Sequence, residues 1–376
     1  MNKLKSYVWN MMIGYYPNSE KGDSPVDRRR GGRIIKELIN YGFNTSNYNP
    51  ENDSKHFDIV IISGLRNIDS IIADRLRKIN TYFILDLPDA LLLSAGPHLR
   101  MISRIMRGVR VIEWKLFGIK TFNQKLTKLI SLCDAITVGS STQAKLLFRY
   151  NKNVSKIPDI IDEEYARVCK RVSLNNETRL VWEGFGENVL HFEVIRNALK
   201  ELSLRYSIEL HVFSNESIPK YFKHAGSVER YLSTLPCRTI FHPWRKETCA
   251  DDLLKGDIGI IPIDLRNQFA SAKPENKLNI LRILGLPAVA TPTEAYREAI
   301  QDGIDGFLAF NSREWVDKVG QLIEDINIRE RFGYIGREKA LKQASFSNIW
   351  PQWLKVLSSL DGRKEKPFPL SDIFNH

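Results

Sequence analysis

The chain has 376 residues, 43% of them hydrophobic, and a formal net charge of +11 at pH 7. This length is enough for two domains of ordinary size, each with its own core. It contains no apolar run near the roughly 18 residues of a membrane-spanning helix and no cleavable signal pattern at its start, so we expect a cytoplasmic protein. The four cysteines form no Cys-x-x-Cys pair, which argues against a disulfide framework or a zinc site.

The positive charge is concentrated in the first half of the chain. Residues 1–172 hold 28 Lys and Arg against 17 Asp and Glu, whereas the remainder holds 27 of each. The excess is densest over residues 98–130, where apolar residues lie between basic ones that include Arg100, Arg104, Arg107 and Arg110. Such a basic amphipathic segment favours peripheral contact with an anionic membrane surface at the inner face of the cell membrane. A solvated helix packed on its own domain explains the pattern almost as well, and the absence of a recognised motif argues against a nucleic-acid partner.

Strand and helix patterns alternate through the first half of the chain. Strands are predicted over residues 7–13, 57–63, 82–86, 135–139 and 154–158, and helices over residues 31–41, 68–79 and 140–150. This rhythm is typical of a doubly wound α/β domain with a parallel sheet. A polar run at residues 173–178 is predicted to be a linker, which gives a first domain of residues 1–172.

A second alternating series covers residues 179–345. It starts with a strand at Arg179 and continues with a helix over residues 192–202 and strands over residues 208–213, 239–244, 257–263 and 287–291. Between the last two strands a helix is predicted, with Pro274 at a first helical position and Gly285 as its left-handed stop. The remaining residues, 346–376, include an apolar and aromatic segment at residues 347–360 that we expect to be a packed helix.

Two features of the second series suit an anionic ligand. In parallel sheets ligands collect beyond the carboxyl ends of the strands, where helix amino-termini present N–H groups. Lys273 and Lys277 flank the start of the predicted helix, and Gly184 and Gly186 let the backbone after the first strand approach a ligand closely. The plain alternatives are exposed lysines at a helix start and an ordinary strand-to-helix turn.

Residues 257–310 resemble the donor-binding half of GT-B glycosyltransferases. The resemblance rests on Asp-Ile-Gly-Ile-Ile-Pro-Ile, Ala-Lys-Pro-Glu-Asn-Lys-Leu, Gly-Leu-Pro-Ala-Val-Ala-Thr and Asp-Gly-Ile-Asp-Gly-Phe-Leu-Ala, in that order. In the first domain, residues 57–63, 82–89, 134–141 and 157–162 are similar to strand ends that face the cleft in bacterial members. The resemblance implies two Rossmann-like domains facing across a cleft, transfer from a nucleotide sugar to a glycan acceptor, and neither a metal nor a cofactor beyond the nucleotide sugar itself.

The resemblance also implies roles for particular residues. Lys273 and Lys277 match basic positions that meet the donor diphosphate, and Arg245 joins them as a candidate. The loop with Gly184 and Gly186 matches the one that approaches the phosphates. The region after the donor helix touches the sugar or phosphate in the family, which makes candidates of Thr293, Glu294 and Tyr296.

One departure from the family pattern concerns ribose recognition. Many retaining members carry a Glu-x7-Glu pattern whose second carboxylate accepts hydrogen bonds from the ribose hydroxyls. The matching places here are Ala272 and Ile280, whose side chains accept none. Ribose recognition must then come from elsewhere, for which Glu275 and Asn276 are the candidates, or be missing.

On the acceptor side, Asp86 and Asp89 follow a predicted strand of the first domain. A carboxylate there suits a catalytic base or an acceptor ligand, although an Asp before Ala90 is equally suited to cap a helix. The loop at residues 23–33 resembles the flexible amino-terminal loop that closes over the donor in relatives. Within it Arg28 and Arg29 are candidates for holding an anionic group, and a basic surface loop is the alternative.

Three functions agree with these observations. The leading one is a glycosyltransferase acting in the synthesis of a bacterial surface polysaccharide such as lipopolysaccharide or capsule, with a glycan or lipid-linked glycan as acceptor. Because Ala272 and Ile280 replace the two carboxylates, a non-catalytic GT-B subunit of a glycan-assembly complex is the second. A nucleotide-sugar isomerase is the third, and it would have no use for the basic segment.

Overall fold

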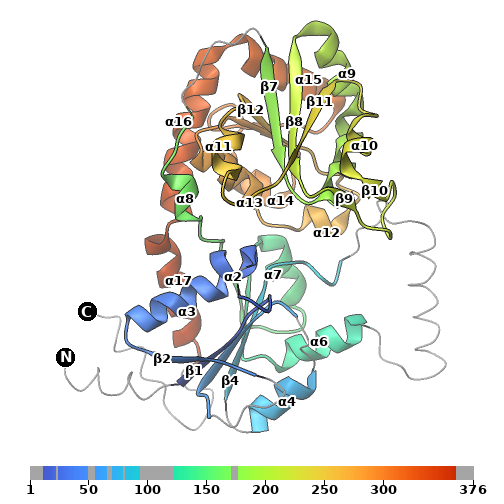
Figure 1. Ribbon diagram of the computed structural model, residues 1–376. Helices are drawn as coiled ribbons and strands as arrows, with labels where there is room; N and C mark the ends of the chain where they lie inside the picture. Colours follow the sequence, from blue (N-terminus) through green and yellow to red (C-terminus); the bar gives the residue numbers. More distant parts are fainter. Residues whose placement is uncertain are drawn as a thin grey trace, which may run out of the picture. The chain divides into compact units, whose positions relative to one another are not determined.

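The protein is described by a computed structural model that covers residues 12–22, 24–49, 56–65, 70–78, 81–93, 122–170 and 177–360. These residues form two compact units (Figure 1). Unit 1 contains the described residues up to Leu92, those from Phe122 to Ile160, and those from Ala344 onwards, whereas unit 2 contains Leu93 and residues Ile161 to Gln343. Most of the basic segment predicted at residues 98–130, including its four arginines, lies outside the described residues.

Unit 1 is built on a six-stranded parallel sheet. Its strands are β1 (Met12–Tyr16), β2 (Asn44–Asn47), β3 (Ile59–Ser63), β4 (Tyr82–Leu87), β5 (Ala135–Val138) and β6 (Val154–Lys156). They lie in the order β2-β1-β3-β4-β5-β6, and every pairing is parallel. The order reverses beside β1, as in doubly wound folds. The strands β3 and β4 are buried throughout, which explains their nearly continuous apolar sequences.

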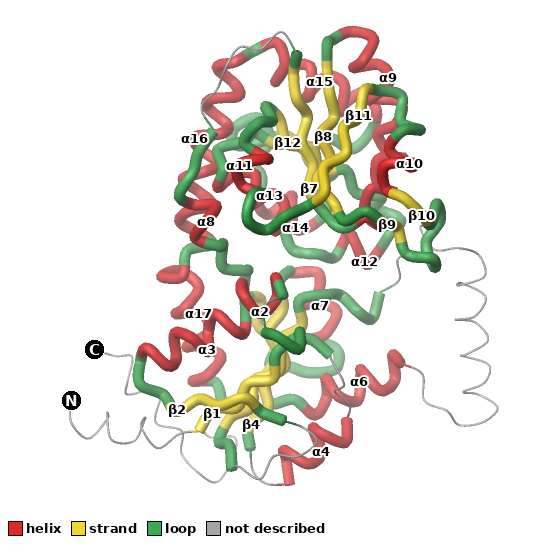
Figure 2. Tube along the Cα trace, viewed as in Figure 1, coloured by secondary structure: helices red, strands yellow, loops and turns green. Residues whose placement is uncertain are grey.

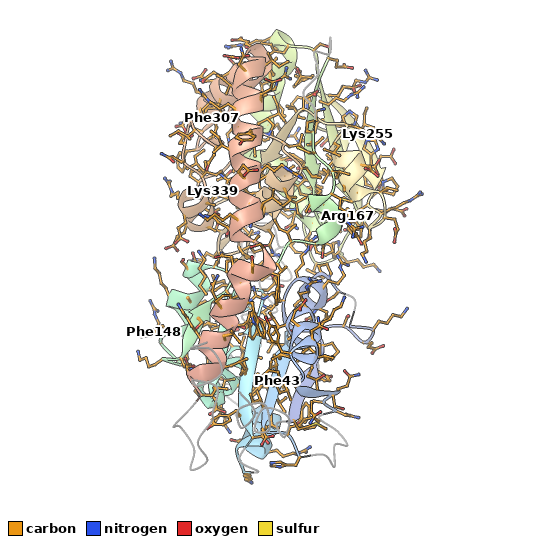
Figure 3. All side chains as sticks on the ribbon, turned by 90° about the vertical axis from the view of Figure 1, so that its left-hand side faces the viewer. Phe43, Phe148, Arg167, Lys255, Phe307 and Lys339 are labelled. Atoms are coloured by element: carbon orange, nitrogen blue, oxygen red, sulfur yellow. The ribbon has the colours of Figure 1, made fainter. Side chains whose placement is uncertain are left out.

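Helices cover both faces of this sheet (Figure 2). The helices of unit 1 are α2 (Pro25–Arg29), α3 (Gly31–Asn40), α4 (Ser70–Lys78), α6 (Phe122–Leu132), α7 (Ser141–Leu147) and α17 (Phe346–Ser358). On one face Ile34 and Leu38 of α3 pack with the strands, and α17 shares this core. On the other face α4, α6 and α7 pack on the alternate residues of the same strands. Phe43, labelled in Figure 3, closes the first of these cores.

Unit 2 repeats the architecture with its own six-stranded parallel sheet. The strands are β7 (Thr178–Glu183), β8 (Ile208–Ser214), β11 (Arg238–Pro243), β12 (Ile258–Ile261), β13 (Ala288–Ala290) and β14 (Phe307–Leu308). Their order is β11-β8-β7-β12-β13-β14. The first strand, β7, thus lies between β8 and β12. The chain adds β8 and β11 on one side of it and then β12, β13 and β14 on the other. The switch point of this sheet is at β7 and β12.

Both faces of the second sheet are covered by helices. One core is formed with the 3-10 helix η2 (Gly186–Ile195), α9 (Arg196–Arg205), α10 (Val228–Leu232) and α15 (Ser312–Glu324). The other is formed with α8 (Glu163–Ala166), α11 (Cys249–Leu253), α13 (Asn276–Ile283) and α14 (Glu294–Ala299). Outside these layers lie α16 (Ile326–Gln343), which packs on α13, the short helix α12 (Gln268–Ser271), and the antiparallel pair β9 (Ser217–Ile218) and β10 (Gly226–Ser227).

Three local predictions differ from the structure. The first strand is β1, Met12–Tyr16, not residues 7–13, of which 7–11 lie outside the described residues. The helix expected over residues 192–202 begins as η2 and becomes α-helical only at Arg196, because Val189 and Phe192 are buried in η2 and no amphipathic period marks it. Pro274 precedes the N-cap Glu275 and is outside α13, whereas Gly285 takes the predicted left-handed conformation with φ 73°.

Candidate functional site

The candidate site lies in unit 2, at the carboxyl ends of β7 and β12. These neighbouring strands mark the switch point, where the connections leave the sheet edge in opposite directions. In doubly wound sheets ligands bind at such a point. The loop after β7 carries Gly184 and Gly186, and α13 follows β12 in the chain. Two motifs that are about 90 residues apart are therefore brought to one edge of the sheet, as Lys277 and Glu183 show by their contact.

Lys277, in the first turn of α13, is the central side chain of this site. Its ammonium donates a hydrogen bond to the backbone oxygen of Glu183, and its Nζ lies 4.5 Å from the ring centroid of Trp182. Burial lowers the pKa of Lys277; the carboxylate of Glu183 raises it and the nearby Lys273 lowers it. An ammonium has three donors, so two remain for an anion, and an anion would stabilise its charged form.

The two glycines after β7 allow close packing but do not offer their own N–H groups. The Gly184 N–H donates to Phe213 O at 3.1 Å, and the Gly186 N–H donates to Asn215 Oδ1 at 2.8 Å. A Cβ on Gly184 would lie 2.1 Å from Lys277 Nζ, and one on Gly186 would lie 2.5 Å from Ser217 O. The glycines therefore make room for the lysine and for the neighbouring loop, a role different from direct phosphate contact.

The start of α13 gathers the other candidates for this edge. Glu275 is its N-cap residue and Asn276 its first helical residue, both partly exposed. Lys273 lies just before them, with its ammonium 4.6 Å from the ring centroid of Phe269 and near enough to Lys277 to affect its pKa. The structure thus brings together four of the predicted donor residues, which are Gly184, Lys273, Asn276 and Lys277.

The candidates after β13 divide between cap and core. Thr293 is the N-cap of α14, and its hydroxyl accepts a hydrogen bond from the Tyr296 N–H at 3.3 Å. Tyr296 is buried in the core that α13 shares, and burial together with the Glu275 carboxylate raises its pKa. Glu294, in the first turn of α14, is partly exposed and is the member of this group best able to meet a ligand.

Arg245 follows the edge strand β11 and is separated from β7 by β8 in the sheet. Its side chain is exposed, and no ion pair involving it occurs among the described residues. It lies at the same carboxyl edge as Lys277, because all strands of the sheet are parallel. The structure gives no contact between these two cations.

In unit 1, Asp86 is the acceptor of a fully buried ion pair. Arg30 donates to it through Nη2 at 2.7 Å and through Nε at 3.0 Å, and Thr137 Oγ1 donates at 2.7 Å. Arg30 also binds Asp159 at 2.7 Å. Burial alone would lower the pKa of Arg30, but the two carboxylates outweigh it and raise it. These contacts leave Asp86 inside the protein as the anchor of Arg30.

Asp89 is partly exposed and lies beyond the end of β4. The next residues form a turn at residues 91–92, and no helix begins within the described part of this segment, residues 90–93. Asp89 lines a small pocket with Gln143 and with apolar side chains of the turn, α6 and α7. Of the two predicted acceptor-side carboxylates, Asp89 is therefore the one that borders open space.

The loop between β1 and α3 is organised by Asp27. Its carboxylate accepts hydrogen bonds from Tyr15 Oη at 2.8 Å, Ser24 Oγ at 2.7 Å, and both Asn18 N and Ser19 N. Burial would raise the pKa of Asp27, but these hydrogen bonds outweigh it and lower the pKa.

The two candidate arginines of this loop, Arg28 and Arg29, form the last turn of α2 and are partly exposed. Their neighbour Arg30 is the buried partner of Asp86. The internal bonds of Asp27 fix the described part of the loop, so these arginines belong to a defined turn.

Three expectations concern features that the sequence does not contain. Ala272 and Ile280 are both buried, with 1% and 5% of their surface exposed, so neither position presents a polar side chain to a ribose. Within the described part of the chain, no cluster of three or more His, Cys, Asp or Glu side chains is arranged to hold a metal ion. The described helices also include none with the length and apolar character needed to cross a membrane.

Sequence reasoning missed two contributors to these sites. Asn215, after β8, holds Gly186 and also donates to Ser217 O at 2.7 Å, and no motif marks it. Asp159 is the second carboxylate that binds Arg30. Its position shortly after β6 is the one sequence signal that predicts a place near a strand end. Both depend on which strands are neighbours in the sheet.

Comparison with known proteins gives similarity at the level of structure. No protein-family model matches the sequence, and no curated protein matches it. Among solved structures, a glycosyltransferase from Rickettsia africae has a TM-score of 0.60 at 12% identity, covering 94% of this chain and 99% of that one. HepE from Anabaena in complex with UDP and glucose has a TM-score of 0.60 at 12% identity, covering 93% and 100%.

Sucrose-phosphate synthase from Thermosynechococcus elongatus has a TM-score of 0.62 at 11% identity, covering 92% of this chain and 98% of that one. TarM from S. aureus is also similar, with a TM-score of 0.54, but the chain spans only about half of it, 55%. At these identities the similarity establishes the fold. The GT-B fold predicted from the sequence, with two parallel-sheet α/β units, is confirmed.

Proposed function

We propose that the protein is a nucleotide-sugar-dependent glycosyltransferase whose donor diphosphate binds unit 2 at the start of α13. The observation that carries this proposal is the position of Lys277, held against Gly184 and Trp182 at the switch point of the sheet. Its ammonium is partly buried and has a lowered pKa, so a phosphate bound beside it would be a favourable charged partner. The fold shared with HepE, which was solved with UDP, supports a nucleotide donor.

The chemistry follows from where charge develops. When the bond from the sugar to the diphosphate breaks, negative charge grows on the leaving phosphate oxygens, and fixed cations nearby stabilise that transition state. Lys277 and Lys273 supply two cations, and the amino-terminal end of α13 adds a partial positive charge. The proposed reaction needs no metal at this site, and Lys277 is its principal donor-side residue.

On the acceptor side we assign the interacting carboxylate to Asp89. It borders the pocket beyond β4, whereas Asp86 is occupied by Arg30 and Thr137. The proposed acceptor is a glycan, free or lipid-linked, of a bacterial surface polysaccharide. Replacing Asp89 with Asn should reduce transfer while leaving UDP affinity unchanged, and equal losses in both would contradict this assignment.

The test of donor binding is saturation-transfer NMR with UDP-, GDP-, dTDP- and CMP-sugars, followed by calorimetry with the best ligand. Lys277→Ala should weaken binding about 10- to 100-fold, the equivalent of a charge-assisted hydrogen bond of about 1.5–3 kcal/mol. The matched control is Lys200→Ala, which removes an exposed lysine of α9 and should leave affinity unchanged. Unchanged affinity in Lys277→Ala would overturn the proposed site.

The basic segment at residues 98–130 carries a second part of the proposal, which is peripheral attachment to an anionic membrane surface on the cytoplasmic side. Its alternating basic and apolar residues support it. Flotation with vesicles of neutral lipid alone and of neutral lipid mixed with phosphatidylglycerol provides the test. Binding that requires the anionic lipid and falls with salt is expected, and equal recovery with both vesicles would contradict it.

One observation favours a second candidate function. Ala272 and Ile280 are buried apolar residues where retaining relatives carry carboxylates, which suits a GT-B protein that binds glycans or partner subunits without transferring a sugar. The ligand panel separates the two candidates. Selective binding of one nucleotide sugar favours the transferase, and absence of binding to all of them favours the non-catalytic subunit.

A further inference from the structure

A pair of hydrogen-bonded histidines joins β8 to the edge strand β11 in unit 2. His211 Nδ1 lies 3.0 Å from His242 Nε2, and the other ring nitrogen of His211 lies 3.2 Å from Glu209 Oε2. The ring planes differ by 10°, and their centroids are 5.2 Å apart. Because the 3.0 Å contact accounts for most of that separation, the rings meet edge to edge in nearly one plane. This geometry aims an N–H of one ring at the lone pair of the other.

The hydrogen-bond chain fixes which nitrogens carry protons. In the neutral pair, His211 Nε2–H donates to Glu209, so His211 Nδ1 carries no proton and accepts a hydrogen bond from His242 Nε2–H. The remaining nitrogen, His242 Nδ1, has no hydrogen-bond partner among the described residues and is the place where a proton can enter. His242 is partly exposed, which gives solvent access.

The pair can hold one additional proton without losing its hydrogen bond. When a proton binds at His242 Nδ1, the proton of His242 Nε2 can pass to His211 Nδ1, and the positive charge then lies beside the Glu209 carboxylate. A second proton makes both facing nitrogens N–H donors. Two donors at 3.0 Å cannot share a hydrogen bond, so the second protonation must break the side-chain contact between the two rings.

The surrounding charges agree with this order of protonation. Glu209, 4% exposed, also accepts from Arg238 at 2.7 Å and lies 3.8 Å from Arg179. From α11 and the turn after it, Asp252 raises the pKa of His242 and Lys255, labelled in Figure 3, lowers it. Burial is the largest effect and, with His211, it keeps the pKa of His242 below its ordinary value.

Phe213 supports the outer ring of the pair. Its ring stacks on His242 with a centroid distance of 4.6 Å and an interplanar angle of 13°. Phe213 is itself buried in the core under α11 and α13. The contact therefore holds His242 in the plane of its partner and connects β11 to the core through one side chain.

We propose that His211 and His242 form a one-proton site that fastens the edge strand β11 to β8 near neutral pH and releases it in acid. Among the strands that the structure describes, β11 is at the edge of the sheet and pairs with β8 alone. Trp244 and Arg245 continue directly from its end, so the release affects the part of the ligand-facing edge that they form. This inference does not depend on what unit 2 binds.

The direct test is NMR of the ring nitrogens between pH 8 and pH 4. The pair should take up its two protons in separate steps, with the step of His242 below the ordinary histidine value of about 6.5. In His211→Gln the step of His242 should move up toward that value. Two independent steps close to 6.5, unchanged by the substitution, would overturn the proposal.

Hydrogen exchange provides the structural readout. Protection of the β11 amides, relative to those of the central strand β7, should fall at least tenfold below the second step in the wild type. In His242→Gln the amide side chain carries no titratable proton, so protection should vary little over the same pH range whatever its starting value. Loss of protection in acid that is equal in both proteins would contradict the switch, and so would constant protection in the wild type.

Discussion

The ammonium of Lys277 occupies the space in which a side chain at Gly184 would begin, since a Cβ built there would lie 2.1 Å from Nζ. The two residues belong to different motifs, one after β7 and one at the start of α13. Lys277 Nζ can take this position because residue 184 has no Cβ. Loss of either residue should therefore have one common effect on an anion bound at this edge.

Gly184→Ala should weaken UDP binding about as much as Lys277→Ala, roughly 10- to 100-fold, because the added methyl group displaces Nζ. The double variant should be little weaker than either single one, since both remove the same interaction. Calorimetric titration of the four proteins completes this cycle. Fully additive losses would show that Gly184 acts independently of the lysine.

Arg30→Ala should destabilise unit 1 by about 3–5 kcal/mol, because it leaves the carboxylate of Asp86 buried without its cation. Asp89→Asn, at a partly exposed position of the same unit, should change the free energy of unfolding by less than about 0.5 kcal/mol. Urea denaturation of both variants provides the comparison. A small effect of Arg30→Ala would indicate that Asp86 is not anchored as described.

Asp27→Asn should lower the free energy of unfolding by about 1–3 kcal/mol at neutral pH, because the amide cannot accept all the hydrogen bonds that converge on the carboxylate. The folded-state pKa of Asp27 is lowered. Its stabilising contribution is thus present above the unfolded value of about 3.9 and is lost as the pH falls through the lower folded value. Unfolding curves at pH 7 and pH 3 should show the gap between wild type and variant narrowing in acid, and a gap that widens would contradict this account.

Thr293→Ala should cost about 1 kcal/mol of stability through loss of the α14 cap, and Thr293→Ser should restore most of it. If Thr293 acts only as a cap, UDP-sugar affinity should be the same in the alanine and serine variants once both are folded. Thermal unfolding and calorimetry distinguish the outcomes. A loss of affinity in the alanine variant that serine recovers would show that the hydroxyl contacts the donor.

The second sheet was largely predictable from the sequence because its strands are short apolar runs and the helix between β12 and β13 has a clear stop residue, although its predicted first residue, Pro274, precedes the N-cap. The β12-α13-β13 unit is confirmed, with Gly285 in the left-handed stop conformation. The ten-residue η2 was not predictable, since its apolar residues are buried without a helical period and 3-10 helices of this length are uncommon.

The individual site residues were easier to predict from the sequence than the contacts between them. Lys277 and Gly184 were each marked by local chemistry, but their contact depends on the order of the strands. The sequence makes Asp86, like Asp89, a candidate catalytic base or acceptor ligand because it lies near the end of a predicted strand. The guanidinium bound to Asp86 belongs to Arg30, 56 residues earlier in the chain, and no local sequence pattern predicts this pairing.

The helix α17 belongs to the core of unit 1, to which it contributes Ile349, Trp350 and Trp353, although it follows the whole of unit 2 in the chain. During synthesis, then, the sheet of unit 1 is complete long before the residues that cover part of it leave the ribosome. The strands and helices of unit 2 that the structure describes, from Ile161 to Gln343, have all been made by that time. Unit 2 can therefore fold before unit 1 is complete, and part of one apolar face of unit 1, the part beside α3, stays uncovered until α17 is synthesised.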